Sequence, residues 1–388
     1  MEKTQTNFGS LALQPETLRA LQKMGFAAPT PIQEKTIPLM LDGYDVIAKA
    51  PTGTGKTCAF GIPLLECLDP DGEDIQAVIL CPTRELCLQI TEELRALAAF
   101  RPGVRITPIY GGQSIGTQIN ALKKKPQIVV ATPGRLLDHM GRRTVWLGNV
   151  YTAVLDEADE MLKMGFIKDV RRILNATPAD TQVVMFSATI SRDVMDVAWE
   201  YQHDAVEINV EATGENRPKI QQYALISKGS QRLSDMTKII DALGLKRVMV
   251  FGNMKSTVRQ LDMRLKQQHR SVDCLNGDIP QGQRNRVMAG FRNGDFEILV
   301  ATDVAARGID VDDVEAVFNY DIPDENEYYL HRIGRTGRAK RHGISITFMT
   351  ENDQFRMRDI RKYCHADIEM VTLAEDGHLL REDGTRAV

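Results

Sequence analysis

The sequence predicts an α/β protein with two tandem, doubly wound parallel-sheet domains. Its 388 residues are too many for one average domain and fit two of about 150–200 residues each. Short apolar, β-branched runs alternate with helical stretches in both halves, which is typical of parallel strands buried on both faces. Between the halves, residues 211–218 are polar and broken by Gly and Pro, which indicates a flexible linker. We therefore expect an N-terminal domain over 1–210 and a C-terminal domain over 219–388.

The expected strands are short apolar runs that recur in both halves. Because parallel strands end at a common edge, loops that follow these runs are the places where such a sheet binds ligands. About fifty residues follow the basic segment 331–341, enough for a last strand and helix but not for an added binding domain. The runs are 45–48, 77–81, 106–110, 128–131, 152–155 and 183–186 in the first half, and 223–226, 248–251, 271–275, 298–301, 316–319 and 344–349 in the second.

Composition excludes several classes of protein. No signal peptide is apparent, and no apolar run approaches the roughly 18 residues that a membrane helix needs. The six cysteines form no Cys-x-x-Cys pair, so we expect neither a zinc site nor a disulfide framework. We expect a cytoplasmic location, because the cytosol is reducing. A net charge of −4 is not that of a protein that holds nucleic acid by charge alone. Any nucleic-acid binding must therefore come from local arrangement, such as the basic segment 331–341.

Residues 50–57 read Ala-Pro-Thr-Gly-Thr-Gly-Lys-Thr and follow an expected strand. The general phosphate-loop pattern begins with glycine, where this chain has alanine. Gly53 and Gly55 still allow positive φ, so that backbone N–H groups can converge on an anion at the start of a helix. Lys56 can then reach the β- and γ-phosphates, and the Thr57 hydroxyl can ligate Mg²⁺. A plain strand-to-helix turn is the alternative.

Residues 156–159 read Asp-Glu-Ala-Asp directly after another expected strand. Asp156 would therefore lie where an open α/β sheet binds its ligand, and could hold the magnesium ion. Glu157 would lie within reach of the γ-phosphate, where it could position or deprotonate a water molecule. The acidic run could instead begin a solvated helix. Together with the phosphate loop, it predicts hydrolysis of a nucleoside triphosphate.

Further motifs occur in a fixed order along the chain, most of them directly after an expected strand. They are 29–33 (Pro-Thr-Pro-Ile-Gln), 82–86 (Pro-Thr-Arg-Glu-Leu), 111–112 (Gly-Gly), 132–135 (Thr-Pro-Gly-Arg), 187–189 (Ser-Ala-Thr), 250–255 (Val-Phe-Gly-Asn-Met-Lys), 301–310 (Ala-Thr-Asp-Val-Ala-Ala-Arg-Gly-Ile-Asp) and 331–338 (His-Arg-Ile-Gly-Arg-Thr-Gly-Arg). In order and spacing, this set resembles the DEAD-box family of RNA-dependent ATPases, and the resemblance covers essentially the whole chain. It implies two RecA-like domains and an ATP-dependent RNA helicase, with ATP and Mg²⁺ as cofactors.

The resemblance also implies how the base of the nucleotide is recognised. The Gln33 amide can accept from N6–H of adenine and donate to N7, a pattern that guanine reverses, and Phe26 offers a ring for stacking. Taken alone, Phe26 and Phe8 could both be core residues. The resemblance adds Thr52 of the phosphate loop and Asp310, at the ATP ribose, to the nucleotide contacts.

The remaining site residues are implied by the resemblance. It assigns contacts with RNA to Pro82, Thr83, Arg84, Gly112, Thr132, Pro133, Gly134, Arg135, Gln283, Arg286 and Thr302. It assigns the coupling of hydrolysis to strand separation to Asp159, Ser187, Thr189, His331 and Arg332. Many members have His where this chain has Asn276, and we assign that position no function.

Three arginines, Arg332, Arg335 and Arg338, stand three residues apart, a spacing that predicts guanidinium groups along one helix edge or turn. A planar, permanently charged donor suits the spread negative charge of a transferring phosphoryl group. We therefore expect Arg335 and Arg338 to be arginine fingers that act with Lys56 and the acidic pair. A generic basic surface is the alternative.

The sequence thus predicts a clamp in which hydrolysis requires closure of the two domains across the linker. Closure would join two parts of an RNA surface, bend the strand and open short duplexes. A DNA helicase or translocase on the same core, and a non-catalytic ATP-dependent RNA clamp, are the alternative functions. We expect a monomer that relies on partner proteins for targeting, because contacts to sugar and phosphate carry no base information.

Overall fold

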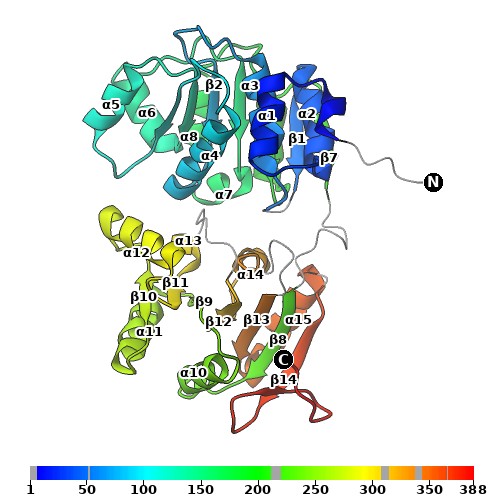
Figure 1. The fold of residues 1–388 in the computed structure, drawn as a ribbon, viewed down its shortest axis with the longest axis vertical. Coiled ribbons are helices and arrows are strands. Elements are labelled where there is room, and N and C mark those ends of the chain that lie inside the picture. The colour runs from blue at the N-terminus through cyan, green and yellow to red at the C-terminus, as the bar shows by residue number, and fades with distance from the viewer. Residues whose placement is uncertain (1–6, 51–52, 211–219, 307–313, 337–342, 365) are drawn as a thin grey trace, which may run out of the picture. The chain divides into compact units, whose positions relative to one another are not determined.

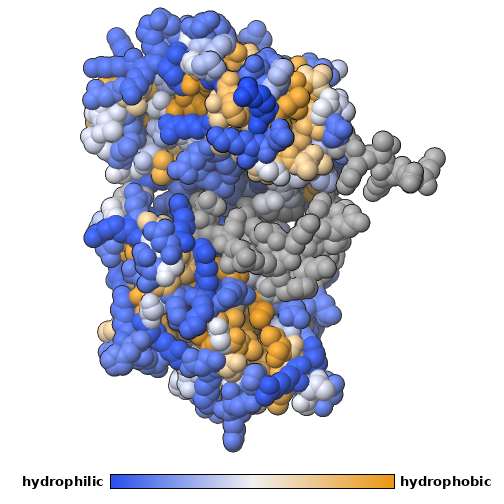
Figure 2. All heavy atoms as spheres, in the orientation of Figure 1, coloured by the Kyte–Doolittle hydropathy of each residue, from blue (hydrophilic) through white to orange (hydrophobic). Residues whose placement is uncertain are grey.

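The computed structural model describes residues 7–50, 53–210, 220–306, 314–336, 343–364 and 366–388. The chain divides into two compact units, Met1–Gly214 and Glu215–Val388 (Figure 1). The segment 211–218, which we expect to be a linker, lies outside the described residues. On the face shown in Figure 2, the described surface is mainly hydrophilic, with apolar residues visible in patches.

The first unit is built on a seven-stranded sheet in the order β3-β4-β2-β5-β6-β1-β7, and every neighbouring pair is parallel. Its strands are β1 (Val46–Lys49), β2 (Ala77–Leu80), β3 (Ile106–Ile109), β4 (Ile128–Ala131), β5 (Thr152–Leu155), β6 (Gln182–Ser187) and β7 (Val206–Asn209). Its helices are η1 (Phe8–Leu11), α1 (Pro15–Lys23), α2 (Pro31–Leu41), α3 (Lys56–Cys67), α4 (Arg84–Leu97), α5 (Ile115–Leu122), α6 (Pro133–Gly141), α7 (Ala158–Lys163), α8 (Ile167–Leu174) and α9 (Arg192–Tyr201).

Both faces of this sheet are covered by helices, which explains the continuous apolar runs. Val46 and Ala48 of β1 pack into a core formed with α1 to α4. Ile47, between them, packs into a second core with α5 to α9. Because successive side chains of a strand point to opposite faces, a strand covered on both sides needs apolar residues at every position.

The second unit has an eight-stranded sheet in the order β10-β11-β9-β12-β13-β8-β14-β15, parallel except for the antiparallel pair β14–β15. Its strands are β8 (Ile220–Ile226), β9 (Val248–Phe251), β10 (Val272–Leu275), β11 (Ile298–Ala301), β12 (Ala316–Asn319), β13 (Gly343–Met349), β14 (Ile368–Leu373) and β15 (Leu379–Leu380). Its helices are α10 (Arg232–Ala242), α11 (Lys255–Gln267), α12 (Gln281–Asn293), α13 (Asp303–Ala306), α14 (Asn326–Ile333), η2 (Glu351–Asp353) and α15 (Gln354–Cys364). Helices α10 and α11 pack on one core of this unit, and α12 to α15 contribute to two others.

The fold class predicted from the sequence is confirmed, and a strand is present at each of the predicted runs. Three strands, β7, β14 and β15, were not expected. In β7 only Ile208 is buried, while Glu207 and Asn209 are exposed. Such a strand lies at a sheet edge and pairs on one side only, so it needs no continuous apolar run and leaves no strong signal in the sequence.

Candidate functional site

The motifs of the first unit lie at the carboxyl-terminal edge of its sheet, and the strand order sorts them into two groups. The phosphate loop follows β1, the Asp-Glu-Ala-Asp segment follows β5, and Ser187 ends β6, so this group occupies the neighbouring strands β5-β6-β1. The motifs that the resemblance assigns to RNA follow the neighbouring strands β3-β4-β2. We call these the nucleotide half and the RNA half of the edge. They meet where β2 pairs with β5.

The phosphate loop has the backbone that its glycines predict. Gly53 and Gly55 have φ of 79° and 89°, in the left-handed region that favours glycine. Gly55 is also the N-cap of α3, so the first N–H groups of that helix face the loop. A Cβ atom on Gly55 would lie 2.5 Å from Nε2 of Gln33, so both backbone conformation and space require glycine here. Thr52 lies outside the described residues.

Lys56 and Asp156 form a buried ion pair at this edge. The distance from Lys56 Nζ to Asp156 Oδ1 is 3.8 Å, and both side chains are less than a tenth exposed. Burial raises the pKa of Asp156, while the Lys56 ammonium and the Glu157 N–H, which donates to Asp156 Oδ1 at 3.0 Å, lower it. The carboxylate is thus held beside Lys56, the first residue of α3, and the half-buried Thr57 follows Lys56 in that helix. Carboxylate and hydroxyl oxygens are ligands that suit Mg²⁺, so the residues present fit that ion.

Glu157 adopts an uncommon backbone conformation. Its φ of 52° and ψ of 49° place it in the left-handed region, at the turn between β5 and α7. For a residue other than glycine, this conformation costs roughly 1–2 kcal/mol. Such strain persists where the surrounding structure enforces it, often at functional sites. It supports the interpretation of Glu157 as a residue of the reaction centre rather than of a solvated helix start.

Hydrogen bonds connect the ends of β5 and β6. Thr189 donates to Asp159 Oδ2 through both its backbone N–H, at 2.9 Å, and its hydroxyl, at 2.8 Å. The Asp159 N–H donates to Ser187 Oγ at 3.3 Å, and Ser187 Oγ donates to the Thr189 carbonyl at 2.6 Å. These three residues, which the resemblance assigns to coupling, therefore form one connected group within the nucleotide half.

The adenine-recognition segment is tied directly to the phosphate loop. Gln33 Oε1 accepts from the Thr30 N–H at 2.9 Å, and Gln33 Nε2 donates to the Gly55 carbonyl at 3.0 Å. Thr30 Oγ1 donates to the Thr54 carbonyl at 2.8 Å. An amide has two donors and two acceptor positions, so each end of Gln33 retains one for a base.

Exposure separates the two phenylalanines of the N-terminal segment. Phe8 is 5% exposed and belongs to the core, whereas Phe26 is 42% exposed. A ring with an exposed face is available for stacking, which a core ring is not.

In the RNA half, exposed and half-buried residues lie beside buried ones. Thr83 Oγ1 accepts from the Leu86 N–H at 3.2 Å and caps α4, which begins at Arg84. Pro82, Thr132 and Pro133 are buried, whereas Arg84 and Arg135 are half-buried, and Gly112 and Gly134 are exposed. Side-chain contacts to a phosphate would therefore come mainly from the two arginines, with helix-starting N–H groups beside them.

In the second unit, the Arg332 side chain is fully buried. Its Nε and Nη2 atoms donate to the two carboxylate oxygens of Asp303, each at 2.6 Å. The guanidinium group also donates to Asn253 Oδ1 and to the Asp321 carbonyl, both at 2.7 Å, and lies over the Phe251 ring. These partners lie at or just beyond the ends of β9, β11 and β12, so Arg332 joins three strand ends from inside the unit.

Of the helix edge or turn that the arginine spacing predicts, the structure places Arg335 in the turn after the helix. Helix α14 ends at Ile333, and Arg335 lies beyond it, with Nε donating to the His331 carbonyl at 3.2 Å. The spacing of three keeps residues on one helix face only while the helix continues. Arg338 lies outside the described residues.

The other described residues that we predicted in the second unit follow the neighbouring strands β10 and β11. Gln283 and Arg286 are exposed on α12, and Thr302 is buried just before α13. Asp310 lies outside the described residues. Asn276 is buried and its side chain accepts from the Asp278 N–H at 3.0 Å, a role in the loop that agrees with the absence of an assigned function.

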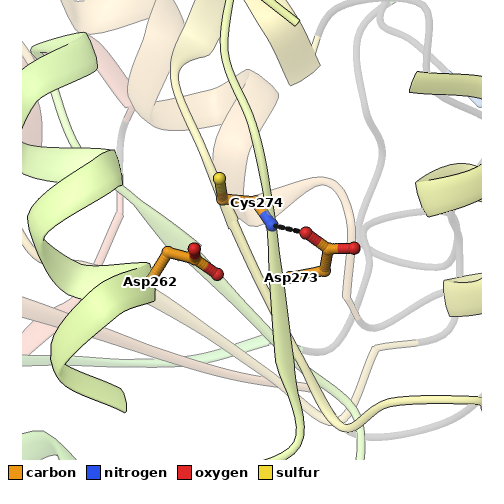
Figure 3. A group of neighbouring side chains, drawn as sticks. All are labelled: Asp262, Asp273 and Cys274. Carbon is orange, nitrogen blue, oxygen red and sulfur yellow. Dashed lines mark hydrogen bonds between the residues drawn. The ribbon is translucent and has the colours of Figure 1, made fainter. Parts of the chain in front are cut away.

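One group of possible metal ligands, Asp262, Asp273 and Cys274, lies between α11 and β10 (Figure 3). Lys266 Nζ lies 2.9 Å from Asp262 and 3.9 Å from Asp273, so both carboxylates already pair with an ammonium group. Burial raises the pKa of the Cys274 thiol to about 11, which disfavours the thiolate that a metal needs. We assign this group to the structure of the unit.

Comparison with known proteins decides the family. Residues 30–197 match the family model of the DEAD/DEAH box helicases, and residues 231–340 match the helicase conserved C-terminal domain. The DEAD-box ATP-dependent RNA helicase CshA of Geobacillus kaustophilus is 44% identical over 357 residues, which cover 92% of this chain and 76% of that protein. This chain belongs to the DEAD-box family. It is an ATP-dependent RNA helicase, as the sequence motifs implied.

Further relatives of this DEAD-box helicase agree. CshA of Bacillus subtilis is 43% identical over 355 residues, which cover 92% of this chain and 72% of that protein. The structure of S. cerevisiae Dbp5 bound to RNA and ADP BeF3 has a TM-score of 0.85 and 33% identity, and covers 95% of each chain. The fold of this helicase, with two RecA-like units, is therefore the fold of that family.

Some functional contacts of this helicase were missed from the sequence. The Thr30 hydroxyl and Gln33 form a capping box at the start of α2, a pattern that is readable as Thr-x-x-Gln. Asp303, Asn253 and Arg332 all stand in quoted motifs, but these motifs are distant in sequence and no local pattern indicates that the three residues are bonded to one another. Within the described residues, no helix has the length and apolar character to span a membrane.

We predict that Gly112→Ala weakens RNA binding by this helicase. Gly112 has a φ of 88°, and an added Cβ atom would lie 2.1 Å from Arg84 Nη1. The substitution would displace the Arg84 guanidinium and strain the loop after β3. We expect the RNA concentration for half-maximal stimulation of ATPase activity to rise several-fold. Gly116→Ala is the matched control, because a Cβ atom there meets no atom closer than 3.8 Å, and an equal effect of both variants would contradict the prediction.

Proposed function

We propose that this helicase couples ATP hydrolysis in the nucleotide half to RNA bound in the RNA half, through one closed state of its two units. The observation that carries the proposal is the strand order of the first sheet, which sets the two groups of motifs side by side along one edge. At the nucleotide half, the Asp159–Thr189–Ser187 group joins the acidic segment to the end of β6. A structural change in one half can therefore be transmitted to the other half through neighbouring strands.

For hydrolysis, we assign the nucleotide phosphates to Gly53, Gly55 and Lys56. Thr57 and Asp156 would hold Mg²⁺, which would neutralise charge that develops on the phosphate oxygens. The adenine would stack on Phe26 and pair with the two hydrogen-bonding positions that remain on Gln33.

In the chemical step, a water oxygen forms a bond to the γ-phosphorus while the bond from that phosphorus to the β–γ bridging oxygen breaks. The products are ADP and phosphate. Glu157 orients the water and accepts its proton. Lys56 and the arginine fingers, Arg335 and Arg338, stabilise the charge of the transferring group.

The arginine fingers belong to the second unit and the other catalytic groups to the first, so hydrolysis requires closure. The RNA surface is also shared in this proposal, with Arg84, Arg135 and their loops in the first unit. The second unit contributes to this RNA surface through Gln283, Arg286 and Thr302. ATP and RNA would then bind cooperatively, because each stabilises the same closed state. If the closed path fits only a bent single strand, closure separates a short duplex locally.

The assembly and targeting parts of the proposal follow from the same contacts. We propose a monomer that acts on single-stranded and short duplex RNA, with protein partners that select the substrate. Contacts to phosphate and sugar carry no sequence information, so a helicase core that uses only such contacts needs another source of specificity.

The test is stimulation of ATPase activity by single-stranded RNA and by single-stranded DNA of the same length and sequence. We expect RNA to stimulate turnover and DNA to have little effect at equal concentration. Equal stimulation would favour the alternative of a DNA helicase or translocase on the same core. Absence of turnover with either polymer would favour the non-catalytic clamp.

A further inference from the structure

A buried polar cluster lies directly beneath the RNA half. It consists of Gln118 on α5, His139 on α6 and Thr144 after α6. Gln118 is 1% exposed and His139 is fully buried. Burial of polar groups is costly unless every donor and acceptor is paired, so a cluster of this kind is retained only where its hydrogen bonds are satisfied.

The Gln118 amide is fully satisfied and therefore fixed in orientation. Its Oε1 accepts from Arg135 Nη1 and from His139 Nε2, each at 3.0 Å. Its Nε2 donates to the Tyr110 carbonyl at 2.8 Å and to Gln113 Oε1 at 2.9 Å. These four bonds use the whole capacity of an amide. Since Oε1 can only accept, the proton of the neutral His139 ring must be on Nε2.

The surroundings keep His139 in that neutral form. Burial lowers the pKa of His139, as does Arg135 and, to a smaller extent, Arg142, while Asp138 acts in the opposite direction. In this tautomer Nδ1 is the acceptor and lies 2.8 Å from the Thr144 oxygen, whose hydroxyl is also within hydrogen-bond distance, 3.0 Å, of the His139 carbonyl. Both ring nitrogens thus have one partner and one defined role.

The cluster determines where the Arg135 guanidinium points. Arg135 Nη1 donates one hydrogen to Gln118 Oε1 and the other to the Gln113 carbonyl, at 2.9 Å. The described residues give Nε and Nη2 of Arg135 no hydrogen-bond partner, which leaves three N–H groups for a phosphate. Gln118 also binds Tyr110 and Gln113, so the same amide holds the loop after β3 against the start of α6.

We propose that His139 and Gln118 are positioning residues that hold Arg135 in the geometry that binds RNA. The inference rests on the proposed contact between Arg135 and RNA. Neither residue touches the RNA itself: His139 fixes the Gln118 amide, and Gln118 fixes the guanidinium. A binding group that is oriented in advance loses less conformational freedom when the ligand arrives.

The test compares His139→Asn with His139→Gln. Asparagine places its amide near the position of Nδ1 and cannot reach Gln118, whereas the Nε2 of glutamine replaces the donor to Gln118 Oε1. We expect His139→Asn to raise the RNA concentration for half-maximal ATPase stimulation by about 2–12-fold, the range for one lost hydrogen bond. Maximal turnover and the KM for ATP should stay at wild-type values. His139→Gln should restore most of the RNA affinity.

A double-mutant cycle with Arg135→Ala separates positioning from stability. If His139 acts through Arg135, the double variant should need no more RNA than Arg135→Ala alone. Equal effects of Asn and Gln at 139, or additive effects in the cycle, would overturn the inference while Arg135→Ala still weakens RNA binding. An unchanged RNA requirement in Arg135→Ala would instead overturn the proposed RNA contact. Gln118→Met, similar in length but without hydrogen bonds, replaces His139→Asn in the cycle if that variant does not fold.

Discussion

Replacing Arg338 by alanine is expected to lower RNA-stimulated ATP turnover by about 10³–10⁵-fold, the contribution of an arginine finger in related phosphoryl transfers. The guanidinium would stabilise charge that develops only in the transition state, so the variant should bind ATP and RNA separately as the wild type does. Phosphate release at saturating RNA and ATP measures turnover. Equilibrium binding measures the affinity for ATP and the affinity for RNA separately.

The control for Arg338→Ala is Arg358→Ala, which removes an exposed arginine on α15 of the same unit. It should retain wild-type turnover. Thermal unfolding of both variants should match that of the wild type, in contrast to a change at the buried Arg332, where the partner Asp303 would be left unpaired. Near-normal turnover in Arg338→Ala would contradict the assignment of catalytic groups to both units.

Glu157→Gln is expected to lower turnover by about 10²–10⁴-fold, the usual contribution of general acid–base catalysis. Glutamine has nearly the shape of glutamate and pays a similar cost for the positive φ at this turn, so the path from β5 to α7 should persist. ATP would then hold the closed state without being consumed. We expect labelled RNA to remain bound in the presence of ATP for much longer than in the wild type after a chase with unlabelled RNA.

Glu92→Gln is the matched control for this variant, since Glu92 is an exposed residue of α4 away from the strand ends. It should turn over ATP and release RNA as the wild type does. Rapid release of RNA by Glu157→Gln in ATP would show that hydrolysis is not the step that resets the clamp. Full ATPase activity in that variant would remove Glu157 from the reaction.

The contrast between Arg332 and Arg335 shows how much local sequence can predict. The spacing of the arginines predicts guanidinium groups along one helix edge or turn and does not distinguish the two. In the structure, α14 ends between Arg332 and Arg335, and the Arg332 guanidinium is directed inward to Asp303. Where a helix stops and which face it buries depend on what packs against it, and no spacing rule contains that information.

The His139–Gln118 pair makes the same point for the candidate site. Arg135 was identified from its motif, whereas the residues that orient it were not. A histidine and a glutamine 21 positions apart on different helices carry no pattern that distinguishes them from ordinary polar residues. Only the fold brings them together beneath the loop after β3.

The sequence by itself determined the fold class and the family, and it predicts the phosphate loop and the reacting groups. These are local properties. Continuous apolar runs indicate strands buried on both faces, and glycines before a lysine indicate a backbone that binds phosphate. The tertiary structure alone decided the order β3-β4-β2-β5-β6-β1 along the edge, and with it the separation of the nucleotide and RNA halves. It also decided which polar residues are buried as supports, because burial and pairing depend on neighbours that are distant in the chain.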